Sequence, residues 1–94
     1  MSADIVNQGD EIISVGQLNQ QAKTLLENQF RGVSVIGEIS NMARPSSGHI
    51  YFTLKDEDGA IRCAMFRNQN LRLNFEPQNG DQCILKGQVS LYAP

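Results

Sequence analysis

The chain has few of the residues that usually carry catalysis or metal binding. It holds one histidine and two cysteines, and no tryptophan, among 94 residues. Cys63 and Cys83 each stand alone in an apolar stretch, whereas disulfide frameworks need more cysteines and metal sites usually contain close pairs. We therefore interpret both as buried free thiols of a protein in the reducing cytoplasm.

Motifs of several enzyme and membrane classes are also missing. No apolar run approaches the ~20 residues that span a membrane, and Met1–Asp4 lacks the basic-then-apolar pattern of a secretory signal. Neither a zinc-peptidase motif nor a nucleophile elbow nor a phosphate-binding glycine loop occurs. The acidic run Asp56–Asp58 could suggest Mg²⁺, but consecutive side chains in a tight turn point apart, which favours a solvated hairpin tip. We expect no catalytic residue, metal, cofactor or membrane partner.

The charge is slightly negative, and its distribution matters more than its sum. The formal net charge is −2 at pH 7, which is a weak argument against a polyanionic partner. Residues 1–43 carry five acidic and two basic side chains, whereas residues 44–94 carry six basic and five acidic ones. Three of those five acids are packed into Asp56–Asp58. The second half can therefore present a local basic surface.

The amino-terminal part of the chain predicts a lead-in followed by a helix. Residues 1–12 show no periodicity and are expected to be flexible. A helix is predicted from Val15 to about Asn28, because Ser14 and Gln17 form a capping-box pattern and apolar residues recur on one face. Its simplest role is to cover the open end of the structure that follows. Residues 13–94 are then expected to form one small domain.

After the helix the period changes to the alternation of β-strands. We predict strands at Val33–Asn41, His49–Lys55, Ala60–Phe66 and Gln82–Tyr92, with a short helix or irregular connection over residues 67–74. Gly37 inside the first strand is typical of a bend or bulge. This order is typical of a mainly β OB-fold, a five-stranded Greek-key barrel with an amino-terminal helix, here lacking strand five. A generic antiparallel sheet with a covering helix is the alternative.

Alternation divides the middle strands into an inward and an outward set. The inward, apolar set is Ile50, Phe52, Leu54, Ile61, Cys63 and Met65. The outward set brings two aromatic rings next to cations, an arrangement that binds single strands because bases stack on rings and cations neutralise phosphates. Small Ala64 would leave room for a flat base. With two flanking arginines, the candidate nucleic-acid-binding residues are Arg44, His49, Tyr51, Lys55, Arg62, Phe66 and Arg67.

These candidates also have purely structural interpretations. Phe66 could cover a second small core under the helix, and His49 could be an ordinary strand-end residue. Lys55 and Arg62 could be solvated, or could pair with the acids of the adjacent turn and contribute little. The residues alone leave these alternatives open.

Long stretches of the chain resemble the exonuclease VII large subunit family. The similarity runs through Gly37–Asn41, Arg44–Asp56 and Ile61–Arg67, and it continues in Pro77, Gly80, Gly87 and Val89–Tyr92. The resemblance implies an amino-terminal OB domain that grips DNA in a cytoplasmic bacterial enzyme. In that family a separate central domain degrades single-stranded DNA from either end, and a carboxy-terminal region gathers small subunits. No position of this chain corresponds to the family's catalytic residues.

The resulting hypothesis is a single-stranded DNA-binding module without an active site of its own. One alternative is an RNA-binding OB domain, and another is a domain that docks onto a neighbouring domain or subunit. Small subunits are expected to bind through parts of the parent protein outside this chain.

The absent fifth strand is expected to leave sheet edges open. Such edges expose backbone N–H and C=O groups that recruit other chains. We therefore expect a homodimer or higher assembly, formed by strand exchange or edge pairing through Gln82–Tyr92. The alternative is a monomer in which the helix or residues 1–12 cover the gap.

Overall fold

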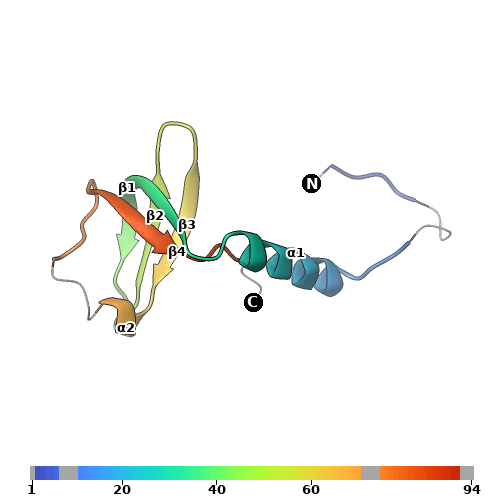
Figure 1. Cartoon of the computed structure of the whole chain (residues 1–94), viewed down its shortest axis with the longest axis horizontal. Coiled ribbons are helices and arrows are strands. Elements are labelled where there is room, and N and C mark those ends of the chain that lie inside the picture. The colour runs from blue at the N-terminus through green and yellow to red at the C-terminus, as the bar shows by residue number, and fades with distance from the viewer. Residues whose placement is uncertain (1, 7–10, 71–74, 92–94) are drawn as a thin grey trace. The chain divides into compact units, whose positions relative to one another are not determined.

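The computed structural model describes residues 2–6, 11–70 and 75–91. Its elements follow the order α1, β1, β2, β3, α2 and β4 (Figure 1). The chain divides into two compact units, one of Met1–Val33 with Gly87–Pro94 and one of Ser34–Lys86. Within the described ranges no helix combines the length and apolar character that a membrane span needs.

The first unit is built on helix α1 (Val15–Gln29). The backbone amide of Gln17 donates to Ser14 Oγ at 3.0 Å, and the backbone amide of Ser14 donates to the side-chain oxygen Oε1 of Gln17 at 2.8 Å. This reciprocal pair is the predicted capping box, which occupies amides that a helix start otherwise leaves unpaired. The helix runs one residue past its predicted end, and Phe30 then closes it by donating its amide to the Leu26 carbonyl at 2.9 Å.

The apolar face of α1 is exposed within its own unit. No residue of the helix is buried, and Val15 and Leu25 are 76% and 62% exposed. Most helical stability in proteins comes from packing such a face. The covering role expected for this helix stays a prediction.

Residues 88–91 do not continue a strand, and two of them bond to the end of α1. The Val89 amide donates to the Phe30 carbonyl at 3.2 Å, and Ser90 Oγ donates to Glu27 Oε2 at 2.6 Å. The prediction of a strand as far as Tyr92 is therefore wrong beyond Gly87, because these groups bond outside the sheet. Tyr92 itself lies outside the described residues.

The second unit is a four-stranded sheet in the order β3-β2-β1-β4. The strands are β1 (Val33–Ala43), β2 (Ile50–Lys55), β3 (Ala60–Met65) and β4 (Gln82–Gly87). β2 pairs antiparallel with both β1 and β3. All four predicted strands are present, although β2 and β3 lack the predicted end residues His49 and Phe66. Helix α2 (Arg67–Asn70) confirms the short helix expected there, and residues 71–74 lie outside the described ranges.

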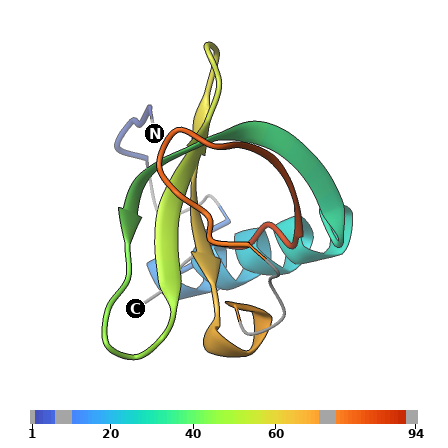
Figure 2. The ribbon, with the colours of Figure 1, turned by 90° about the vertical axis from the view of Figure 1, so that its left-hand side faces the viewer.

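Strand β1 is strongly bent (Figure 2). Its pairing with β2 changes register between Ser40 and Ala43, and Asn41 has a φ of 52°. This register change lies beyond Gly37, and the bend expected at Gly37 itself stays a prediction. Gly37 is also needed for close packing, because a Cβ there would meet Leu54 Cγ at 2.8 Å and the Lys55 carbonyl oxygen at 2.9 Å. Only glycine allows β2 to approach β1 this closely.

The core of the sheet unit is small. Its buried side chains are Ile39, Ile50, Phe52 and Leu54, each at most 4% exposed, which confirms the inward set predicted for the second strand. Partly buried residues from three strands pack against this cluster: Met42, Cys63, Met65, Cys83 and Leu85. Ile61, at the other end of β3, is 45% exposed.

The two cysteines are free thiols, but they are half-buried, so the prediction that they are buried is wrong in its extent. Cys63 lies on β3 and Cys83 on β4, and these are the outer strands of the sheet. An outer strand has a neighbour on one side only and is therefore less completely covered. Partial burial still raises the pKa of both thiols above the ordinary value.

Candidate nucleic-acid interface

The outward face of the β2–β3 hairpin carries most of the candidate residues. Its antiparallel register places Tyr51 opposite Ala64, Thr53 opposite Arg62 and Lys55 opposite Ala60. Tyr51 and Lys55 of β2 therefore each face an alanine on β3. The result is a surface with a ring, two cations and two exposed alanines.

Aromatic rings gather at one end of this face. The His49 ring lies edge-on to Phe66, with centroids 5.4 Å apart, and edge-on to Tyr51 at 6.4 Å. Phe66 is 56% exposed. The structure thus brings together the three predicted ring residues, and it leaves a large part of Phe66 accessible for stacking.

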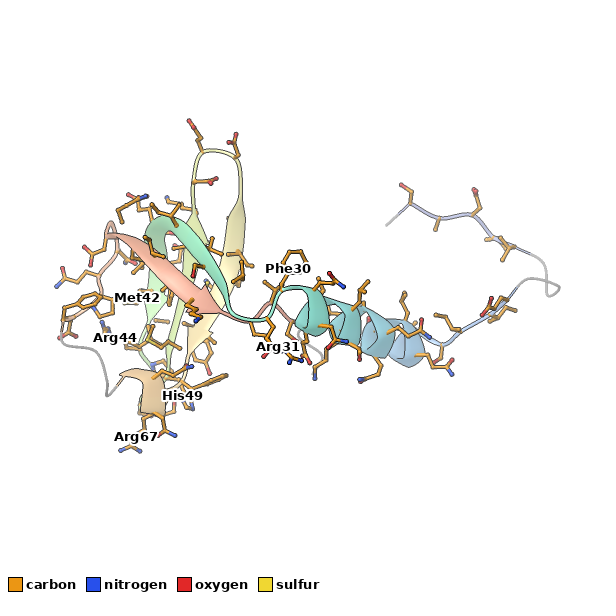
Figure 3. All side chains as sticks on the ribbon, viewed as in Figure 1. Phe30, Arg31, Met42, Arg44, His49 and Arg67 are labelled. Carbon is orange, nitrogen blue, oxygen red and sulfur yellow. The ribbon has the colours of Figure 1, made fainter. Side chains whose placement is uncertain are left out.

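His49 also ties the start of β2 to the start of α2. The backbone amide of Arg67 donates to His49 Nδ1 at 2.9 Å, so this nitrogen is the acceptor. In Figure 3 the labelled His49 lies close to α2. Next to it, the Phe66 amide donates to Gln69 Oε1 and the Gln69 amide donates to the Phe66 carbonyl, both at 2.9 Å. These bonds hold the backbone that carries Phe66.

The two hairpin cations have different partners. Arg62 Nη1 donates to Thr53 Oγ1 at 2.9 Å, within the same outward row. Lys55 Nζ lies 3.7 Å from Glu38 Oε2 on β1, and both side chains are nearly half exposed. The alternative that Lys55 pairs with the acids of the turn is therefore wrong, because its carboxylate partner belongs to β1. An exposed pair of this kind contributes little to stability.

Arg44 is engaged with the segment that precedes β4. Its Nη2 donates to the Pro77 carbonyl at 2.6 Å, and its Nη1 lies 3.3 Å from Glu76 Oε1. Nearby, the Met42 amide donates to Asn79 Oδ1 at 3.0 Å. These groups line an open groove formed by Met42, Arg44, Glu76, Pro77, Gln78 and Asn79. Figure 3 shows Arg44 beside Met42.

Arg67 packs its aliphatic stem against the β1–β2 connection. Gly48 has a φ of +89°, and a Cβ there would lie 3.1 Å from Arg67 Cγ. In Figure 3 Arg67 extends from α2 at the end of the sheet unit. Its backbone amide bonds to the His49 ring. The partners of Arg44 and the contact between Gly48 and Arg67 were missed in the sequence, because they join segments that no local pattern connects.

The acidic turn between β2 and β3 is held by hydrogen bonds to one of its own carboxylates. Asp56 Oδ1 accepts from the amides of Asp58 and Gly59, both at 2.8 Å, and the Asp56 amide donates to the Gly59 carbonyl at 3.0 Å. These bonds confirm the predicted hairpin turn. Across the described ranges, no group of three or more His, Cys, Asp or Glu side chains is arranged to hold a metal ion.

Comparison with known proteins identifies relatives of this chain. It is 55% identical over 85 residues to the exodeoxyribonuclease 7 large subunit of Pasteurella multocida (strain Pm70), and 54% identical over 85 residues to that of Haemophilus influenzae (strain 86-028NP). In both cases the match covers 90% of this chain and 19% of the relative. The large subunit of Klebsiella pneumoniae (strain 342) is 49% identical over 88 residues, or 94% of this chain and 19% of the relative.

These findings confirm the resemblance to exonuclease VII large subunits and the OB-fold class predicted from the sequence. The chain spans 19% of the length of these relatives. A family model described as an OB-fold nucleic acid binding domain matches residues 13–94. The chain therefore belongs to the family of OB-fold nucleic acid binding domains.

Proposed function

We propose that this chain is the single-stranded DNA-binding module of an exodeoxyribonuclease VII large subunit. The observation that carries the proposal is the outward face of the β2–β3 hairpin. There Tyr51 lies opposite an exposed Ala64, Arg62 lies opposite Thr53, and the ring of Phe66, which is 56% exposed, lies beside that of His49. Unpaired bases stack on such rings, and the cations neutralise the phosphates between them.

The module is proposed to hold DNA for a catalytic domain elsewhere in the parent protein, which would degrade single-stranded DNA in the cytoplasm together with small subunits. The named activity of the relatives supports this proposal. The chain by itself should bind DNA without cutting it. Incubation of rigorously pure protein with labelled single-stranded DNA, with and without Mg²⁺, should leave the DNA at full length. Shortened products would contradict the proposal of a non-catalytic module.

The binding role is tested by titrating one labelled oligonucleotide as single-stranded DNA, as duplex DNA and as RNA. We expect weak binding that favours the single DNA strand, because stacking requires unpaired bases. With about two to four phosphate contacts, the logarithm of affinity should fall with the logarithm of salt concentration at a slope of about −1.5 to −3.

The same titration separates the alternatives. Tighter binding to RNA would favour the RNA-binding OB domain. Binding that responds neither to salt nor to removal of Phe66 would favour a docking domain. Absence of all nucleic-acid binding would contradict both nucleic-acid functions.

We also propose that β4 pairs with a second copy of the chain. An OB barrel closes with five strands, whereas the described residues form four, with β3 and β4 at the edges. On β4 the exposed Ile84 (70%) alternates with half-buried Cys83 and Leu85, which pack against the core. Sedimentation over a range of protein concentrations should therefore show a dimer or larger species. A monomer at every concentration would contradict this pairing.

A further inference from the structure

Arg62 is held in place by a partner that carries no charge. Its Nη1 donates to Thr53 Oγ1 at 2.9 Å, and the two residues face each other directly across β2 and β3. Thr53 is half-buried, whereas Arg62 is exposed. The hydroxyl of half-buried Thr53 therefore sets the direction of the exposed Arg62 guanidinium.

Two other cations of the sheet unit lie beside carboxylates. Lys55 lies 3.7 Å from Glu38, and Arg44 lies 3.3 Å from Glu76. A phosphate would have to compete with these acids for either cation. Among the residues that the structure describes, Arg62 has no carboxylate within ion-pair distance. Thr53 thus orders the Arg62 side chain, and the full positive charge of Arg62 stays available to a phosphate.

We infer that Thr53 is a positioning residue for DNA binding, which acts by preorganising Arg62 toward a phosphate. This inference rests on the function proposed above. A guanidinium has five N–H donors, so the bond to Thr53 leaves the others for phosphate oxygens. A side chain that is already ordered loses less conformational entropy on binding, and affinity rises accordingly. In this arrangement Thr53 affects DNA only through Arg62.

The experiment is a double-mutant cycle. Thr53→Val removes the acceptor but keeps the branched shape that suits a strand, and Thr53→Ser keeps the hydroxyl. Each is made in the wild-type chain and in Arg62→Ala, and affinity for a labelled single-stranded DNA oligonucleotide is measured at several salt concentrations. Melting temperatures are recorded for every variant. Thr53→Ala is used in the same cycle should Thr53→Val fail to fold.

Thr53→Val is expected to weaken binding by about three- to tenfold, and Thr53→Ser should keep most of the affinity. In the Arg62→Ala background, Thr53→Val should cause no further loss, because the residue through which it acts is gone. A salt slope that becomes flatter in Thr53→Val, as in Arg62→Ala, would support the same conclusion.

Two results would overturn the inference while the proposed function stands. An equal loss from Thr53→Val in both backgrounds would mean that Thr53 acts independently of Arg62. Full affinity in Thr53→Val, with a loss in Arg62→Ala, would mean that Arg62 needs no positioning. If neither Arg62→Ala nor Phe66→Ala changes affinity, the proposed function itself fails, and the inference fails with it.

Discussion

The two faces of strand β2 differ in burial and in the kind of contact they make. Ile50, Phe52 and Leu54 point inward and are at most 4% exposed. Between them, Tyr51 and Thr53 point outward, are only half-buried, and contact a ring and a cation. Along the six residues of β2, positions that stabilise the domain thus alternate with positions proposed to bind DNA. The two properties should therefore be separable by substitutions at neighbouring positions.

The largest effect is expected on the inward face. Phe52→Ala should lower the free energy of unfolding by about 3–5 kcal/mol, because it leaves a cavity in a core with few other buried side chains. For a domain of this size such a loss is enough to unfold it. Thermal or urea unfolding followed by circular dichroism measures the change. A fully folded Phe52→Ala variant with unchanged stability would contradict the assignment of this face as the core.

A smaller effect is expected where β1 approaches the inward face of β2. Gly37→Ala should destabilise the domain by about 1–3 kcal/mol, because the new Cβ would lie 2.9 Å from the Lys55 carbonyl oxygen, and backbone cannot move aside easily. Gly59→Ala is the matched control, since a Cβ there meets nothing within 4 Å. Equal melting temperatures for the two variants would show that the contact at Gly37 relaxes freely.

Substitutions on the outward face should change binding more than stability. Tyr51→Ala and Phe66→Ala should each weaken binding of single-stranded DNA by about 1–3 kcal/mol if a base stacks on the ring. Fluorescence anisotropy with a labelled oligonucleotide measures the loss, and the melting temperature of each variant is the control. If Phe66→Ala lowers the melting temperature as much as Phe52→Ala does, Phe66 belongs to a core and the separation of the two faces is wrong.

The smallest effects should distinguish two arginines. Arg44→Ala is expected to cost about 1 kcal/mol of stability, because it removes a hydrogen bond to the Pro77 carbonyl. Arg62→Ala should leave stability almost unchanged but flatten the salt slope of DNA binding by somewhat under one unit. Salt titrations and urea unfolding of both variants provide the comparison. A flatter slope for Arg44→Ala alone would place the phosphate contact in the groove beside Met42.

Much of the hairpin could be predicted from the sequence because its signals are local. A half-buried strand leaves a strict two-residue alternation, which identified the inward and outward sets of β2. The helix start was equally visible, because Ser14 and Gln17 satisfy each other within one turn. Such features need no knowledge of distant segments.

What the sequence could not show are contacts between segments far apart along the chain. Lys55 lies within ion-pair distance of Glu38 on another strand, and Arg44 bonds to Pro77 across a long connection. The early end of β4 depends on a bond from Val89 to Phe30, which no alternation pattern could reveal. The incomplete burial of Cys63 follows from its place on an outer strand, and strand order is a property of the whole sheet.

The pairing of β1 with the segment before β4 has a consequence for the order of folding. The Ile39 amide donates to the Asp81 carbonyl at 2.9 Å, and the Gly80 amide donates to the Ile39 carbonyl at 2.8 Å, so these bonds close a loop that contains the whole β2–β3 hairpin. Closing a long loop costs more chain entropy than forming a hairpin with a tight turn. We therefore expect the hairpin to form early and β4 to join last. The surface proposed for DNA would then take shape before the sheet is complete.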